Sequence, residues 1–298
     1  MLNKVRPYMM PVAMLAGIIF YPFFSEFAFL TPYLLFVMLF LTYFNLSLKS
    51  IHITKLHVYL LIIQVVGSIS IYFLLNLFNF LVAQAAMICV LAPTATSAPV
   101  IARILKGNVE SLITYSLLCN MTVAIVAPIF FSWIGTQSEL SFFESFLNIG
   151  KQVAGILIAP LVLALICRKI VRNTFSKAAL FSNVSFILWT VALIIVTAKI
   201  VNFILIQDSK DFVIECAIAG CSLIICILQF LTGRKIGRKF NDTIAGGQGL
   251  GQKNTILAIW MAQTYLNPIS SLGPGVYVLW QNIVNSYQVW RQKDNVPI

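Results

Sequence analysis

Charged side chains are scarce in this chain. Only 10% of its 298 residues are Asp, Glu, Lys or Arg, and nine are acidic, whereas a soluble globular chain averages about 25% charged residues. Hydrophobic residues make up 60% and form runs of roughly 20 residues, the length that crosses the hydrocarbon core of a bilayer. This composition excludes a soluble globular protein, and the segments between the runs are too short for a soluble domain. We therefore predict an integral membrane protein.

Residues that carry metal or hydrolytic chemistry are also few. The two histidines, His52 and His57, lie in one basic segment, and the six cysteines form no Cys-x-x-Cys pair. Neither a His-Glu-x-x-His nor a Gly-x-Ser-x-Gly motif occurs. We therefore expect no disulfide, metal site, cofactor or enzymatic activity. The strands of a membrane β-barrel alternate polar and apolar residues, and runs such as "FILWTVALIIVTA" do not, which favours helices.

Ten apolar runs predict an all-α polytopic membrane protein with ten transmembrane helices. The predicted spans are 8–25, 31–48, 55–77, 80–105, 110–135, 142–168, 179–204, 211–233, 242–266 and 270–290. The start of the chain is positive and then apolar, as in a signal peptide. It lacks a convincing cleavage site of small residues, so we interpret it as the first span.

The basic residues gather at one set of span ends. Sixteen of the twenty lie before the first span or after an even-numbered one: Lys4, Arg6, Lys49, Lys55, Arg103, Lys106, Arg168, Lys169, Arg172, Lys177, Arg234, Lys235, Arg238, Lys239, Arg291 and Lys293. The opposite ends carry Lys210 with Glu26, Glu139, Glu144, Asp208 and Asp211. Because basic loops stay in the cytoplasm, we predict a plasma (inner) membrane protein with both termini cytoplasmic. The net charge of +11 is then a topology signal, and no nucleic-acid partner is expected.

Two spans contain helix breakers. Pro93 and Pro99 lie in "LAPTATSAPV", and each costs about 3 kcal/mol in a helix interior. Four glycines lie in "AGGQGLGQKNT", residues 245–255, at about 1 kcal/mol each. We therefore predict that spans 4 and 9 unwind at mid-depth, where free backbone must face protein or water. Their matching positions predict a 5+5 inverted repeat of residues 1–140 and 141–298, with a transporter's binding site where the two discontinuous helices cross.

At these residues the chain resembles the bile acid:sodium symporter family. Three segments, "APTATSAPVIARILKGNV", "GLGQKNTILA" and "LWQNIVNSY", are similar to the family's Pro-Gly-Gly-Thr-Ala-Ser-Asn stretch with its following Gly-Asn-Val, its Glu-x-Gly-x-Gln-Asn-Ser segment and its Trp-His-Asn-Ile segment. The resemblance covers all ten spans in order. It implies a panel of spans 1, 2, 6 and 7 moving against a core of spans 3–5 and 8–10, with an organic anion near the crossing and two sodium ions behind it.

The resemblance also implies site residues. Substrate-binding positions fall on Thr96, Asn254 and Asn282, with Lys253 and Gln281 beside them. Ion-site positions fall on Gln64, Ser116, Gln252 and Lys253. Other sodium-ligating positions of the family carry no side-chain oxygen here, namely Ala98, Pro99, Leu112 and Gly249. Lys253 occupies the position of a family glutamine, so we expect its ammonium to replace a bound cation, offset by carbonyls at the C-terminal end of a half-helix.

These observations predict a secondary transporter that moves a small organic anion by alternating access, without the family's usual sodium coupling. Proton coupling, exchange and facilitated diffusion are open variants. The alternatives are a transporter-fold sensor or assembly subunit without transport, and a conventional sodium symporter with a rearranged site. The expected partners are the small organic anion, membrane lipid and, in the coupled variant, protons. The sequence sets neither the substrate nor the oligomeric state.

Overall fold

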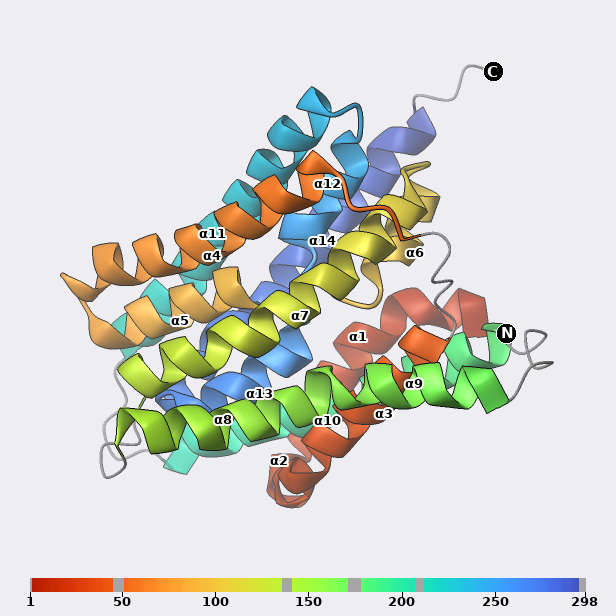
Figure 1. Ribbon diagram of the computed structural model, residues 1–298. Coiled ribbons are helices and arrows are strands. Elements are labelled where there is room, and N and C mark those ends of the chain that lie inside the picture. Colours follow the sequence, from red (N-terminus) through yellow and green to blue (C-terminus); the bar gives the residue numbers. More distant parts are fainter. Residues whose placement is uncertain (1, 45–50, 136–140, 171–177, 207–211, 295–298) are drawn as a thin grey trace.

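A computed structural model describes residues 2–44, 51–135, 141–170, 178–206 and 212–294. Almost all of these residues are helical, and no strand occurs among them (Figure 1). In chain order the elements are α1 Leu2–Ile19, α2 Tyr21–Phe24, η1 Ser25–Leu30, α3 Thr31–Phe44, α4 Lys55–Asn76, α5 Phe80–Leu91, α6 Ala98–Ile104, α7 Val109–Ile134, α8 Phe142–Leu157, α9 Ala159–Ile170, α10 Ala178–Ile206, α11 Phe212–Lys239, α12 Thr243–Gly251, α13 Thr255–Tyr265, η4 Pro268–Ser271 and α14 Leu272–Asp294.

The fold is that of an all-α membrane protein. Within the described residues, six helical segments are long and apolar enough to cross a membrane: Tyr21–Phe44, Lys55–Asn76, Val109–Ile134, Phe142–Lys169, Val184–Leu205 and Phe212–Lys239. They correspond to the second, third, fifth, sixth, seventh and eighth predicted spans. The other four predicted spans coincide with α1, with α5 and α6, with α12 and α13, and with α14. Residues 45–48 of the second predicted span lie outside the described residues.

Several helices differ from their predicted bounds. α1 covers Leu2–Ile19 instead of residues 8–25, and α14 continues to Asp294 instead of residue 290. α11 continues to Lys239 instead of ending at residue 233, because Lys and Arg are good helix formers and favour the negative C-terminal end of a helix. The sixth predicted span is two helices, α8 and α9, that meet at Ile158. Pro160 lacks the N–H that would bond the carbonyl of Ile156, so the helical hydrogen bonding is interrupted there.

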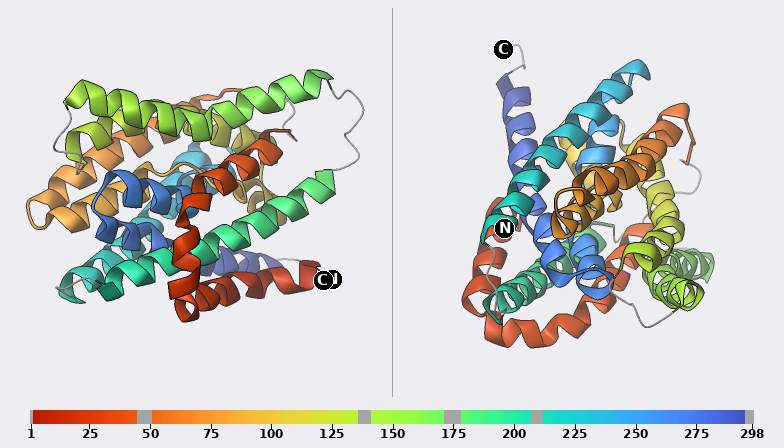
Figure 2. Two further views of the ribbon diagram at one scale, coloured as in Figure 1. Left: turned by 90° about the horizontal axis from the view of Figure 1, so that it is seen from below. Right: turned by 90° about the vertical axis from the view of Figure 1, so that its left-hand side faces the viewer.

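The helices pack in two groups. α4, α5, α11, α12 and α14 pack on one another in the upper part of Figure 1, and α1, α3, α9 and α10 pack on one another in the lower part. α8 lies along α7, and α13 contacts members of both groups. Figure 2 shows the same arrangement from two further sides. The two short helices that carry the breaks, α5 and α12, thus belong to the same group.

α11 and α12 approach each other closely. Gly233 and Gly237 of α11 lie one turn apart and face Gly246 of α12. A Cβ atom added to Gly233 would overlap the carbonyl oxygen of Gly246, and one added to Gly246 would lie 2.8 Å from Cα of Gly237. Small residues spaced in this way let two helix backbones approach closely in a membrane.

Candidate functional site at two interrupted helices

The two predicted helix breaks are present, and they lie against each other. α5 ends at Leu91 and α6 begins at Ala98, while α12 ends at Gly251 and α13 begins at Thr255. The backbone N–H of Ala95 donates to the carbonyl of Gln252 at 2.9 Å, and that of Asn254 donates to the carbonyl of Pro93 at 2.8 Å. Thr94 and Lys253 form an isolated antiparallel pair between these bonds. Backbone groups freed from each helix are therefore satisfied by the other.

The prolines act as predicted, but the glycines do not. Pro93 lies within the first break, and Pro99 lies at the start of α6, where its missing N–H costs little. The four glycines of span nine all lie inside helix α12, and the break follows them at Gln252. The expectation that these glycines unwind the helix is therefore wrong. Their absent side chains make room for neighbours instead: a Cβ on Gly249 would lie 2.9 Å from Cδ1 of Tyr115, and one on Gly251 would lie 2.6 Å from Cδ2 of Phe230.

Lys253 lies at the centre of the crossing. Its side chain is only 1% exposed, and its Nζ donates to the carbonyl of Val90 at 2.8 Å. Val90 is in the last turn of α5, whose unpaired carbonyls carry the negative end of the helix dipole. The ammonium therefore lies against the C-terminus of a half-helix, as expected from the sequence. The backbone N–H of Lys253 donates to Oε1 of Gln281 at 2.8 Å, which fixes the base of the side chain.

The neighbouring carbonyls of α5 are bonded by glutamines. Nε2 of Gln229 donates to the carbonyl of Cys89 at 3.2 Å, and Nε2 of Gln64 donates to those of Leu91 and Ala92 at 2.7 and 3.1 Å. The carbonyls of Cys89, Val90 and Leu91 are thus each met by a side chain from a distant part of the chain. Lys253 is the cationic member of this set.

Gln64, which was predicted as an ion ligand, also uses its amide oxygen in hydrogen bonds. Its Oε1 accepts from the hydroxyl of Tyr115 at 2.9 Å and from Sγ of Cys119 at 3.0 Å. An amide oxygen has two lone pairs, so both are already used. Gln64 therefore caps α5 and anchors Tyr115, and has no oxygen left for a cation in this arrangement.

The end of the second half-helix, α12, is also capped from other elements. The hydroxyl of Thr94 donates to the carbonyl of Gly249 at 2.8 Å, and the hydroxyl of Tyr277 donates to that of Gly251 at 2.9 Å. Both hydroxyl residues are buried, and neither was predicted. Thr94 follows Pro93 in the break and Tyr277 lies one turn before Gln281, so position alone could have suggested both.

The remaining predicted residues divide between the crossing and its surroundings. Gln252 donates from Nε2 to Oγ of Ser97 at 3.2 Å and accepts from Nδ2 of Asn285. Asn254 caps α13 by accepting from the N–H of Leu257 at 3.3 Å. Thr96 lies half-buried in the first break. Ser116, also half-buried, lies on α7, where its carbonyl accepts from Nδ2 of Asn120 at 2.8 Å.

A small cleft adjoins the crossing between α6 and α14. Its volume is about 330 Å³, and it is lined by Ile101, Asn282, Asn285, Ser286, Val289 and Trp290. Asn282 was predicted as a substrate-binding residue, and its Nδ2 donates to the carbonyl of Val278 at 2.6 Å. Asn285, which was not predicted, joins the cleft to Gln252 at the second break. α14 supplies both the amides and the apolar side chains of Val289 and Trp290, and α6 supplies Ile101, a mixed lining that suits a small amphipathic molecule.

Ala98, Leu112 and Gly249, the positions to which the resemblance assigns further sodium ligands, are buried. Ala98 and Leu112 are fully buried and offer no side-chain oxygen. The space beside Gly249 is occupied by the ring of Tyr115 and by Leu60. Within the described residues, no group of three His, Cys, Asp or Glu side chains could hold a metal ion. This part of the crossing therefore consists of side chains that cap the ends of α5 and α12, together with the ammonium of Lys253.

Comparison with known protein families finds no family model that matches the chain, and comparison with curated protein sequences finds no significant match. The function must therefore be inferred from the crossing and its cleft.

Proposed function

We propose that the protein is a secondary transporter that moves a small organic anion across the membrane by alternating access. The observation that carries this proposal is the pairing of two interrupted helices around the buried ammonium of Lys253. Irregular backbone at membrane depth is tolerated only where protein or a wet cavity surrounds it. Paired discontinuous helices are the usual construction of a transporter's central site.

The proposal includes ten spans in a 5+5 inverted repeat, related to the bile acid:sodium symporter family. In this arrangement α1, α3, α8, α9 and α10 form the panel that moves against the remaining helices. The packing of α1, α3, α9 and α10 on one another supports this division. The contact of α8 with α7 would then be one of the surfaces that shift during transport.

The substrate would be small. Ligand pockets usually have volumes of about 300–1,000 Å³, and the cleft beside the crossing lies at the lower end with about 330 Å³. The amides of Asn282 and Asn285 line the cleft and provide hydrogen bonds. Lys253 does not line it, but follows Gln252, which Asn285 contacts, and its ammonium favours an anion nearby. A short carboxylate or sulfonate fits these features better than a steroid.

Uptake by proteoliposomes tests the function. A panel of short carboxylates and sulfonates would be offered with a sodium gradient and a pH gradient imposed separately. We expect uptake of at least one anion and no stimulation by sodium. Uptake that requires sodium would indicate a symporter with a rearranged site. Binding of an anion with neither uptake nor counterflow would indicate a sensor or assembly subunit.

Sodium is expected to leave the protein's stability unchanged. Ala98 and Leu112 offer no oxygen, both lone pairs of Gln64 Oε1 are occupied, and Lys253 already supplies a positive charge. The melting temperature of the purified protein should therefore be equal in sodium chloride and choline chloride at one ionic strength. A saturable rise that is specific for sodium would contradict this prediction.

Both termini are expected to be cytoplasmic. Within the described residues, the basic ends of α11 and α14 meet beside the end of α6, which agrees with one common basic side. The residues Lys49, Glu139, Arg172, Lys177, Asp208, Lys210 and Asp211 lie outside the described residues. Reporter fusions after residues 138 and 208 should be external, and fusions after 173 and 236 cytoplasmic. The reverse pattern at either pair would contradict the ten-span arrangement.

A further inference from the structure

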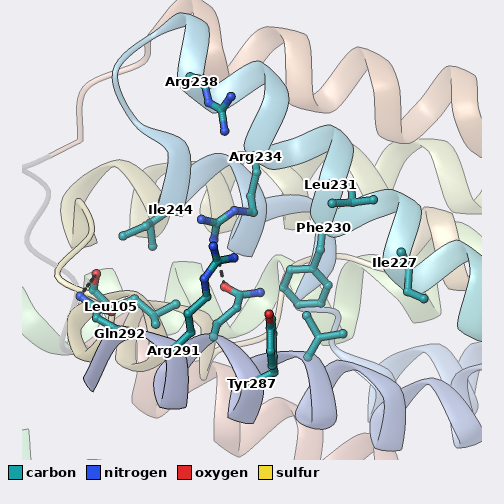
Figure 3. A pocket seen from close by; sticks show the side chains of 12 residues that line it. Leu105, Ile227, Phe230, Leu231, Arg234, Arg238, Ile244, Tyr287, Arg291 and Gln292 are labelled. Carbon is teal, nitrogen blue, oxygen red and sulfur yellow. Dashed lines mark hydrogen bonds between the residues drawn. The ribbon is translucent and has the colours of Figure 1, made fainter. Parts of the chain in front are cut away.

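A second and larger cavity, of about 630 Å³, lies between α11 and α14. Arg234 and Arg238 of α11 and Arg291 of α14 line it, and none of its twelve lining residues is acidic (Figure 3). Ile244 of α12 and Leu105, which follows α6, lie at the same end as the arginines. This cavity is separate from the cleft between α6 and α14, since no residue lines both.

The cavity is cationic at one end and apolar along its length. On α11, Ile227 and Leu231 precede Arg234, and seven residues of helix cover about 10 Å. On α14, Val284 and Tyr287 precede Arg291 in the same direction. Phe212–Lys239 is one of the segments that can cross the membrane. The arginines at its end therefore fall at headgroup depth, and the apolar part of the cavity falls beside the hydrocarbon.

The apolar part of the cavity is open to the side. Ile227 is 43% exposed, Leu231 59% and Tyr287 54%. In a membrane these side chains would contact lipid tails, so a lipid can enter laterally without crossing the headgroup layer. A small hydrated anion could bind the arginines, but it would make no favourable contact with these apolar side chains.

The arginines are arranged for an anion. Nη1 of Arg234 donates to Oε1 of Gln288 at 3.2 Å, which orients one guanidinium. Figure 3 shows the guanidinium groups of Arg234 and Arg291 directed toward each other, with Arg238 above them. Two guanidinium groups that face each other repel because both are positively charged. A phosphate between them would offset this repulsion and accept several charge-assisted hydrogen bonds.

We propose that this cavity binds an anionic phospholipid, with its phosphate among the three arginines and one acyl chain along Ile227, Leu231 and Tyr287. Basic pockets between transmembrane helices on the cytoplasmic side are a known means of binding acidic lipid headgroups. The proposal does not depend on transport, because it concerns only lipid at a fixed site.

Lipid-dependent stability tests the proposal. The purified protein would be placed in nanodiscs of phosphatidylcholine, with or without a minor fraction of phosphatidylglycerol. We expect phosphatidylglycerol to raise the melting temperature by several degrees, and the double variant Arg238→Gln/Arg291→Gln to lose that rise. The control Lys235→Gln/Lys239→Gln removes the same charge from the same membrane face, at exposed positions that do not line the cavity, and should keep the rise.

Native mass spectrometry gives a second measurement that does not depend on unfolding. Phosphatidylglycerol should remain bound to the wild type and to the lysine control, and should be lost from the arginine variant. Equal loss in both double variants would show diffuse surface attraction and overturn the proposal. Stabilisation by inorganic phosphate or glycerol phosphate equal to that by the lipid would show a site for free anions and also overturn it.

Discussion

Replacing Lys253 by methionine is expected to reduce uptake to background while leaving the protein folded. The change removes the ammonium but keeps a flexible side chain of similar volume. Loss of the bond to the Val90 carbonyl leaves a buried acceptor unpaired, which costs about 1–3 kcal/mol. It also removes a charge whose insertion at the bilayer centre costs about 2.5–3.5 kcal/mol. These effects have opposite signs and similar size, so we expect only a small change in stability.

Uptake of the anion found in the substrate panel should be measured together with the melting temperature. The matched control is Lys199→Met, which removes an exposed lysine of α10 and should leave uptake unchanged. Full uptake by Lys253→Met would show that the ammonium is a bystander. A large fall in the melting temperature of Lys253→Met would show that Lys253 mainly stabilises the end of α5. The proposal that its ammonium replaces a bound cation would then be wrong.

The first break could be predicted from the sequence because it contains a proline, whereas the second was predicted from glycines that lie inside α12. Pro93 and Pro99 each lack a backbone donor and lie within the first break and at the start of α6, although Pro128 is accommodated inside α7. A glycine has two common uses in membrane helices, which are to weaken the helix and to let another backbone approach. Only the neighbours decide between them, and Tyr115 of α7 and Phe230 of α11 are distant from span nine in the sequence.

Part of the candidate site could also be predicted from the sequence, namely the partner of Lys253. The charge of Lys253 requires compensation when buried, and the absence of a mid-depth acid left helix carbonyls as the expected partner. Amide side chains such as those of Gln64, Asn254 and Gln281 can cap a helix or bind a ligand, and the spacing of residues does not distinguish these roles. The structure uses all three to hold the two breaks. Thr94 and Asn285 take part through contacts across the chain.

Replacing Gly246 by alanine is expected to destabilise the protein by about 3 kcal/mol, at the upper end of the usual cost of overpacking. The added Cβ would overlap the carbonyl oxygen of Gly233 and lie 2.8 Å from Cα of Gly237. These are backbone atoms, so relief requires α12 to move away from α11. Because α12 leads directly into the second break, this movement would also disturb the pairing of Asn254 with Pro93.

The control is Gly220→Ala in α11, where an added Cβ meets nothing within 4 Å. That substitution should raise stability by up to about 1 kcal/mol, because alanine favours helix. The sign of the stability change in these two variants also distinguishes two roles for the glycines of α12, namely weakening the helix and allowing close packing. If Gly246 served to weaken the helix, alanine there would stabilise α12 as it does at position 220. Because Gly246 serves close packing, alanine should lower the melting temperature at 246 and raise it at 220, in detergent and in nanodiscs alike.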